Sequence, residues 1–157
     1  LALMSEFRRP VVIHQSGAKQ IDALRAAYEE ADVQATLTPF IEDTAQAFAH
    51  ADVVIARAGA STVTELAAIG VAAIYVPFPH AVDDHQTTNA KFVVDAGGGW
   101  LVPQAELTAQ GLADLLQTLT REKLLEVAEK AYAIRKTDAT EKTVAICEQL
   151  THLRGVA

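Results

Sequence analysis

Polar and apolar positions along this chain follow two alternating spacings. Short runs rich in β-branched and other apolar residues predict five strands, at residues 10–15, 33–38, 52–57, 72–77 and 98–103. Segments with apolar residues at helical spacing predict seven helices, at residues 18–31, 43–51, 61–70, 84–97, 108–120, 121–136 and 138–153. Strands that alternate with helices are typical of a parallel sheet covered by helices. We therefore expect an α/β, Rossmann-like fold with a helical C-terminal tail.

The size of the chain favours one domain, residues 1–157. Its 157 residues are 50% hydrophobic, which is enough for one domain with its own core. Residues 1–9 are expected to form the end of a helix. No apolar run approaches the roughly 18 residues of a membrane span, and the charges near the start follow the apolar residues. The sequence thus predicts neither an anchor nor a signal peptide.

Charge and cysteine content exclude some classes of function. The net charge of −7 and the pI near 5.1 argue against binding to nucleic acid or to an anionic membrane, since both require clustered Lys and Arg. An anionic ligand must therefore be held by local geometry. Cys147 is the single cysteine, so no internal disulfide can form and a reducing cytoplasm is the simplest compartment. We expect its side chain to pack within the last helix.

The turn between the strand at 52–57 and the next helix carries an unusual sequence, RAGAST. Gly59 permits an uncommon backbone angle and close approach, and the free N–H groups of Ala60, Ser61 and Thr62 would present the positive end of a helix to a diphosphate. Glu65 looks buried and lies one turn further on the same face, where a carboxylate suits ribose hydroxyls. The alternative is a well-capped helix start, with Ser61 or Thr62 as the cap.

A second polar loop, residues 76–90, follows the strand at 72–77. Four of its side chains could in principle ligate a metal: His80, Asp83, Asp84 and His85. Their spacing matches no compact metal site, so we expect no metal and interpret Asp84 as the N-cap of the next helix. His85 and Gln86 would then project from the first turn and bond to sugar hydroxyls. A solvated polar turn is the alternative.

The third informative loop follows the strand at 33–38. Phe40 and Ile41 are apolar residues in this loop, and a flat base could lie on them with its edge bonded to the backbone of Ile41. Burial as a hydrophobic staple of the next helix is an equally good interpretation.

Four stretches together resemble the C-terminal domain of the MurG family: residues 14–17, 38–70, 76–90 and 138–150. Members of this family are bacterial transferases that add N-acetylglucosamine from UDP-N-acetylglucosamine to a lipid-linked peptidoglycan precursor. The resemblance implies one half of a GT-B fold, with two Rossmann-like domains in the whole enzyme. It also implies inverting transfer without a metal or other cofactor, and that this chain binds the sugar donor.

The resemblance also assigns residues. It implies uracil at Phe40 and Ile41, diphosphate at the helix start, ribose at Glu65, and N-acetylglucosamine near His85 and Gln86. The helix start comprises Gly59, Ala60, Ser61 and Thr62. Family members can carry glutamine at both sugar positions, so His85 is a departure. Arg57 belongs to the matching motif. Its partner could be the ligand or a neighbouring loop, and the resemblance does not decide between them.

The resemblance further implies parts that the chain lacks. A first strand with a glycine-rich loop would precede Leu1, and in a doubly wound sheet it would lie between the strands at 10–15 and 52–57. An N-terminal domain would bind the lipid-linked acceptor, supply the base and meet the membrane. We therefore expect an incomplete donor domain that is inactive alone, in an enzyme peripheral to the cytoplasmic face of the inner membrane.

Two other classes of function stay open. The chain could be the donor domain of another GT-B enzyme that modifies a glycolipid or a secondary metabolite. It could also be a non-catalytic Rossmann-like module, in which the glycine turn is only a cap and Glu65 only a surface acid.

Overall fold

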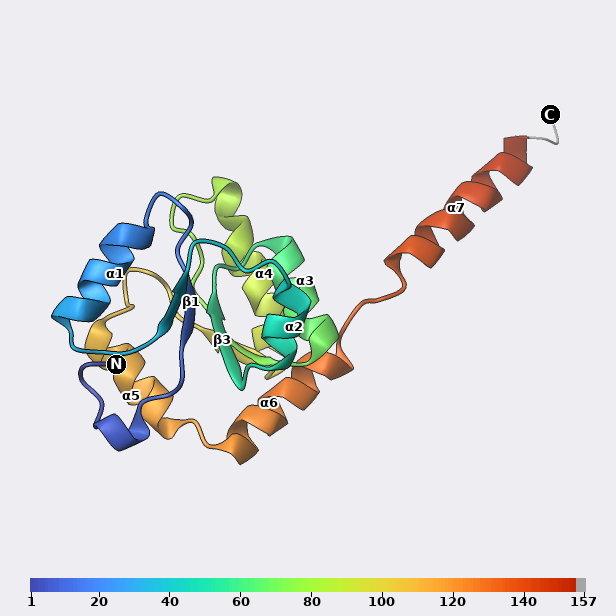
Figure 1. Ribbon diagram of the computed structural model, residues 1–157. Coiled ribbons are helices and arrows are strands. Elements are labelled where there is room, and N and C mark those ends of the chain that lie inside the picture. Colours follow the sequence, from blue (N-terminus) through green and yellow to red (C-terminus); the bar gives the residue numbers. More distant parts are fainter. Residues whose placement is uncertain (155–157) are drawn as a thin grey trace.

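The computed structural model, shown in Figure 1, describes residues 1–154, and over this range strands and helices alternate as expected. The strands are β1 (Ile13–Gln15), β2 (Thr36–Thr38), β3 (Val53–Ala56), β4 (Ala72–Tyr75) and β5 (Gly99–Leu101). The α-helices are α1 (Ile21–Glu30), α2 (Thr44–Ala49), α3 (Ala60–Ile69), α4 (His85–Val94), α5 (Ala109–Thr118), α6 (Arg121–Ala133) and α7 (Ala139–Arg154). The α/β prediction is confirmed, and most elements are shorter than predicted.

The first nine residues do not form the end of an α-helix, so that prediction was wrong. They contain one 3-10 turn, η1 (Glu6–Arg8), flanked by extended backbone at Ser5 and Arg9. Arg9 precedes Pro10, whose ring disfavours the helical conformation at the residue before it. The turn therefore stops at Arg8.

All strand pairs are parallel, and they form two groups. β1 pairs with β2, with Gln15 opposite Thr38, while β3, β4 and β5 form a separate three-stranded sheet with β4 in the centre. Within residues 1–154 no strand pairing joins the two groups. A further strand between β1 and β3 stays a prediction.

The core is built on β4. Its four residues are fully buried, and the Tyr75 side chain packs in one cluster with Leu66 of α3, Val93 of α4 and Ala131 of α6. Burial raises the pKa of the Tyr75 hydroxyl to about 12, so this group stays neutral. At Gly98 an added Cβ would lie 2.8 Å from the Ala131 Cα atom, so only glycine allows α6 to pack this closely.

The remaining helices complete the layers. Figure 1 shows α1 and α5 on one side of the strands and α2, α3 and α4 on the other. α7 extends away from this body, and its apolar side chains Val144, Ile146 and Leu150 are exposed. Cys147 is exposed as well, so the expectation that it packs was wrong. Among the described helices, none is long and apolar enough to cross a membrane.

The core predicts a clear contrast between two leucines. Leu66→Ala should lower the free energy of unfolding by about 2–5 kcal/mol, because it leaves a cavity beside β4 where the side chain is fully buried. Leu125→Ala, at a position 60% exposed on α6, should change it by less than about 0.5 kcal/mol. Urea denaturation of both variants measures the difference, and equal losses would contradict this description of the core.

Candidate functional site

The predicted site residues follow the carboxyl ends of three parallel strands. Phe40 and Ile41 follow β2, the RAGAST turn follows β3, and His85 and Gln86 begin α4 after β4. In a parallel sheet these ends share one edge, which is where ligands of such folds bind. The structure therefore places the predicted residues of these loops at the carboxyl edge of their own sheets, and Glu65 lies one helical turn further along α3.

The turn after β3 differs from expectation in two ways. Gly59 is the N-cap of α3, with φ −62° and ψ 148°, so it adopts ordinary extended backbone, and Ser61 lies inside the helix. A Cβ at Gly59 would meet only the Thr62 Oγ1 atom, at 3.8 Å. Neither the conformation nor the packing of the chain thus requires a glycine here.

The start of α3 is open to a ligand. Gly59 has no side chain that could accept from the first N–H groups of the helix, and Ser61 is exposed. These N–H groups and the helix dipole create positive potential at this end. Glu65 is exposed, because Val63, Leu66 and Ala67 form the face of α3 that packs on the core. The expectation that Glu65 is buried was wrong, and its carboxylate is accessible.

Arg57 contacts a neighbouring loop. Its Nη1 atom donates to the carbonyl oxygens of Val76, at 3.2 Å, and Pro77, at 3.0 Å. Its guanidinium also lies 5.5 Å from the centroid of the Phe78 ring, within range of a cation–π interaction. Arg57 therefore fixes the path of the loop after β4 relative to the turn after β3.

The start of α4 is tied to the same loop. The Gln86 Oε1 atom accepts from the Phe78 N–H at 2.9 Å. Asp84 is the N-cap, as predicted, but its backbone is left-handed, with φ 50°, and its Oδ1 atom accepts from the Thr87 hydroxyl. Within the described residues, no group of three or more His, Cys, Asp or Glu side chains is arranged to hold a metal ion, and the polar loop 80–85 is no exception.

Asn89 was missed by the sequence analysis. Its Nδ2 atom donates to the carbonyl oxygen of Ala58, a fully buried residue, at 3.1 Å. This bond joins α4 to the turn after β3, so the proposed phosphate and sugar segments are held together. The sequence signal for this contact is weak: Asn89 is a polar residue one helical turn after His85.

The loop after β2 is held mainly by its own sheet. The Thr38 hydroxyl donates to the Phe40 carbonyl at 2.7 Å, and the Ile41 N–H donates to the Gln15 Oε1 atom at 2.8 Å. Phe40 is 64% exposed, which contradicts burial as a hydrophobic staple and leaves its ring accessible. Gln15 is the second residue that sequence reasoning missed, although it lies in one of the resembling stretches.

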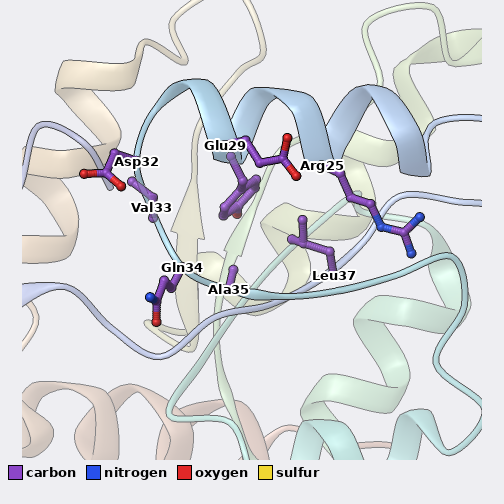
Figure 2. A pocket seen from close by; sticks show the side chains of 8 residues that line it. Arg25, Glu29, Asp32, Val33, Gln34, Ala35 and Leu37 are labelled. Carbon is purple, nitrogen blue, oxygen red and sulfur yellow. The ribbon is translucent and has the colours of Figure 1, made fainter.

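A separate cavity of about 530 Å³ lies away from these loops (Figure 2). Residues of α1, of the segment that leads into β2, and of β2 itself line it: Arg25, Tyr28, Glu29, Asp32, Val33, Gln34, Ala35 and Leu37. It includes no predicted site residue, and most of its lining precedes β2 and so belongs to the opposite edge of the sheet.

The family described as glycosyltransferase family 28 C-terminal domain matches residues 4–148 of this sequence. The chain belongs to this family. A crystal structure of MurG from Acinetobacter baumannii is similar in fold, with a TM-score of 0.85 and 41% identity over 94% of this chain and 46% of that one. The family and this likeness identify the domain as the C-terminal half of a GT-B fold.

Two curated relatives are more similar in sequence. Both are named UDP-N-acetylglucosamine--N-acetylmuramyl-(pentapeptide) pyrophosphoryl-undecaprenol N-acetylglucosamine transferase. The protein from Acidovorax sp. (strain JS42) is 64% identical over 150 residues, which cover 96% of this chain and 38% of the relative. The protein from Polaromonas sp. (strain JS666 / ATCC BAA-500) is 65% identical over 150 residues, or 96% of this chain and 39% of the relative. The chain thus spans about two fifths of the length of these family members.

The bond between Asn89 and Ala58 predicts a stability effect. Asn89→Asp should lower the free energy of unfolding by about 1–3 kcal/mol, because it replaces the donor with an oxygen that faces a buried carbonyl. Thr88→Asp adds the same charge at the adjacent exposed position of α4 and should change it by less than about 0.5 kcal/mol. Chemical denaturation measures both, and an unaffected Asn89→Asp variant would rule out this bond.

Proposed function

We propose that this chain is the donor-binding part of an inverting glycosyltransferase that transfers N-acetylglucosamine from UDP-N-acetylglucosamine to a lipid-linked muramoyl-pentapeptide. The names of the curated relatives describe this reaction for those longer proteins. The observation that carries the proposal in this chain is Gly59 at the open start of α3, where neither backbone angle nor internal packing requires a glycine. A glycine at this position is explained if a ligand has to approach the start of α3 closely.

The diphosphate binds at the start of α3 in this proposal. The N–H groups of Ala60, Ser61 and Thr62 donate to its oxygens, and Gly59 lets the anion approach without a Cβ in the way. The chain carries a net charge of −7, so the anion depends on these local dipoles rather than on a basic surface. The helix end also stabilises the charge of the leaving diphosphate, with no metal ion required.

The ribose and the uracil of the nucleotide contact residues on either side of the diphosphate site at the start of α3. The exposed Glu65 carboxylate accepts from the ribose hydroxyls, one helical turn beyond Ser61. The uracil lies on the exposed ring of Phe40, and its edge is read by the backbone of Ile41.

The sugar lies at the start of α4. Gln86 already accepts from the Phe78 N–H through its Oε1 atom, so its NH₂ group is the end that faces the sugar hydroxyls. His85, exposed in the first turn, supplies a second polar group.

The rest of the enzyme lies outside this sequence in our proposal. A preceding segment supplies a strand between β1 and β3, which is consistent with the exposed apolar side chains of Ile13, 60% exposed, and Ile55, 45% exposed, on these strands. An acceptor-binding domain supplies the catalytic base and meets the cytoplasmic face of the inner membrane. This chain alone then binds the donor side and does not catalyse transfer.

Glu65 gives the most direct test. In the complete two-domain enzyme, Glu65→Gln should weaken UDP binding by roughly 10- to 150-fold, because a charge-assisted hydrogen bond contributes about 1.5–3 kcal/mol. Glu129→Gln, at an exposed position of α6, should leave the affinity unchanged. Calorimetric titration with UDP measures both, and an unchanged affinity in the Glu65 variant would remove it from the site.

Gln86 tests how the sugar is recognised. Gln86→Ala should weaken UDP-N-acetylglucosamine binding far more than UDP binding, and it should reduce discrimination against UDP-N-acetylgalactosamine, since the vacated amide no longer penalises the wrong isomer. His85→Gln should be tolerated, because an amide also donates and accepts. Competition titrations with the three ligands measure this. Equal losses for all three would mean that this helix start shapes the site without reading the sugar.

A further inference from the structure

The backbone N–H that is proposed to read the base already has a partner inside the chain. The Ile41 N–H donates to the Gln15 Oε1 atom at 2.8 Å, within the ordinary range of N–H···O hydrogen bonds. A backbone amide carries one hydrogen. A base that bonds to this N–H must therefore replace the side chain of Gln15.

We propose that Gln15 lowers both the affinity and the uracil selectivity of the base site: its amide oxygen occupies the Ile41 N–H while the site is empty and is exchanged for a carbonyl oxygen of the base. This inference rests on the proposed binding of a uracil nucleotide. The chain then contains an internal competitor that a uracil base has to displace from the Ile41 N–H.

The Gln15 side chain can move away from Ile41 while the loop after β2 keeps its conformation. Gln15 is exposed at the carboxyl end of β1, so its side chain can turn into solvent. Separate bonds hold the loop: the Gly17 N–H donates to the Pro39 carbonyl at 3.1 Å, and the Thr38 hydroxyl donates to the Phe40 carbonyl at 2.7 Å. The Ile41 N–H thus keeps its place when its partner changes.

The exchange also selects the base. The amide oxygen of Gln15 is an acceptor of the same kind as the carbonyl oxygens of uracil, so uracil replaces it like for like. The inference places the 4-position of the base against the Ile41 N–H. There cytosine carries an amino group where uracil has its 4-carbonyl, and this donor would face the Ile41 N–H donor. A cytosine nucleotide therefore cannot complete the exchange and gains nothing when Gln15 is removed.

The test compares two variants in the complete two-domain enzyme, with UDP and CDP as probes in calorimetric titrations. Gln15→Leu removes the competing acceptor and should raise UDP affinity roughly two- to tenfold, the equivalent of one exposed hydrogen bond, with CDP affinity unchanged. Gln15→Glu binds the same N–H more strongly through its charge and should lower UDP affinity by a similar factor. Any general repulsion of phosphate by the new carboxylate would lower CDP affinity equally, so the ratio of UDP to CDP affinity is the decisive quantity.

Gln34→Leu is the matched control, because Gln34 is exposed just before β2, at the opposite edge of the same sheet. It should change neither affinity. Equal or weaker UDP binding by Gln15→Leu, or equal changes for UDP and CDP, would overturn the role of Gln15 while the donor site stands. Failure of the unmodified enzyme to bind UDP would instead overturn the proposed function, and the inference with it.

Hydrogen exchange of the Ile41 amide gives a second readout. In the unmodified enzyme this proton should be protected with and without UDP, because one acceptor replaces the other. In Gln15→Leu it should be protected only when UDP is bound. Protection in the empty variant would show that Gln15 is not its partner and would overturn the proposal.

Discussion

The complete burial of β4 is the constraint on which the rest of this structure depends. Four consecutive residues without solvent exposure can exist only if neighbours pair with both strand edges and helices cover both faces. β3, β5 and the helices of the core cluster are held in place by this requirement. The two loops that are proposed to bind the phosphate and the sugar follow β3 and β4, so their starting points are fixed by this buried strand and its neighbour.

Polar bonds then set the finer geometry at the carboxyl edge. Arg57 binds two carbonyl oxygens of the loop after β4, and Asn89 binds the carbonyl of Ala58 in the turn after β3. All three bonds connect segments that are distant in sequence but adjacent at the carboxyl edge of the sheet. Neither side chain is placed on the ligand in our proposal, and both determine where the ligand-facing groups point.

The sequence predicted the order of the elements because apolar spacing reports directly on burial. It also located every candidate loop, since each follows a strand that the pattern made visible.

Prediction from the sequence failed where the outcome depends on contacts between distant residues. The exposure of Glu65 depends on which face of α3 meets the core, and the partners of Arg57, Asn89 and Gln15 depend on sheet register and loop path. Cys147 was misjudged because spacing within a helix does not tell whether that helix has a neighbour. The ordinary φ of Gly59 could not be inferred either, because glycine is compatible with almost any angle.

The environment of Gly59 has a consequence for how variation at this position is interpreted. The residue has room for a larger side chain and a backbone that any amino acid can adopt. A library sorted only for folded, abundant protein would therefore score the position as permissive. If Gly59 serves the ligand as we propose, a library sorted for growth that depends on the complete enzyme would score the position as intolerant. Comparing the scores from the two libraries, rather than using either alone, would separate residues that the fold requires from residues that ligand binding requires.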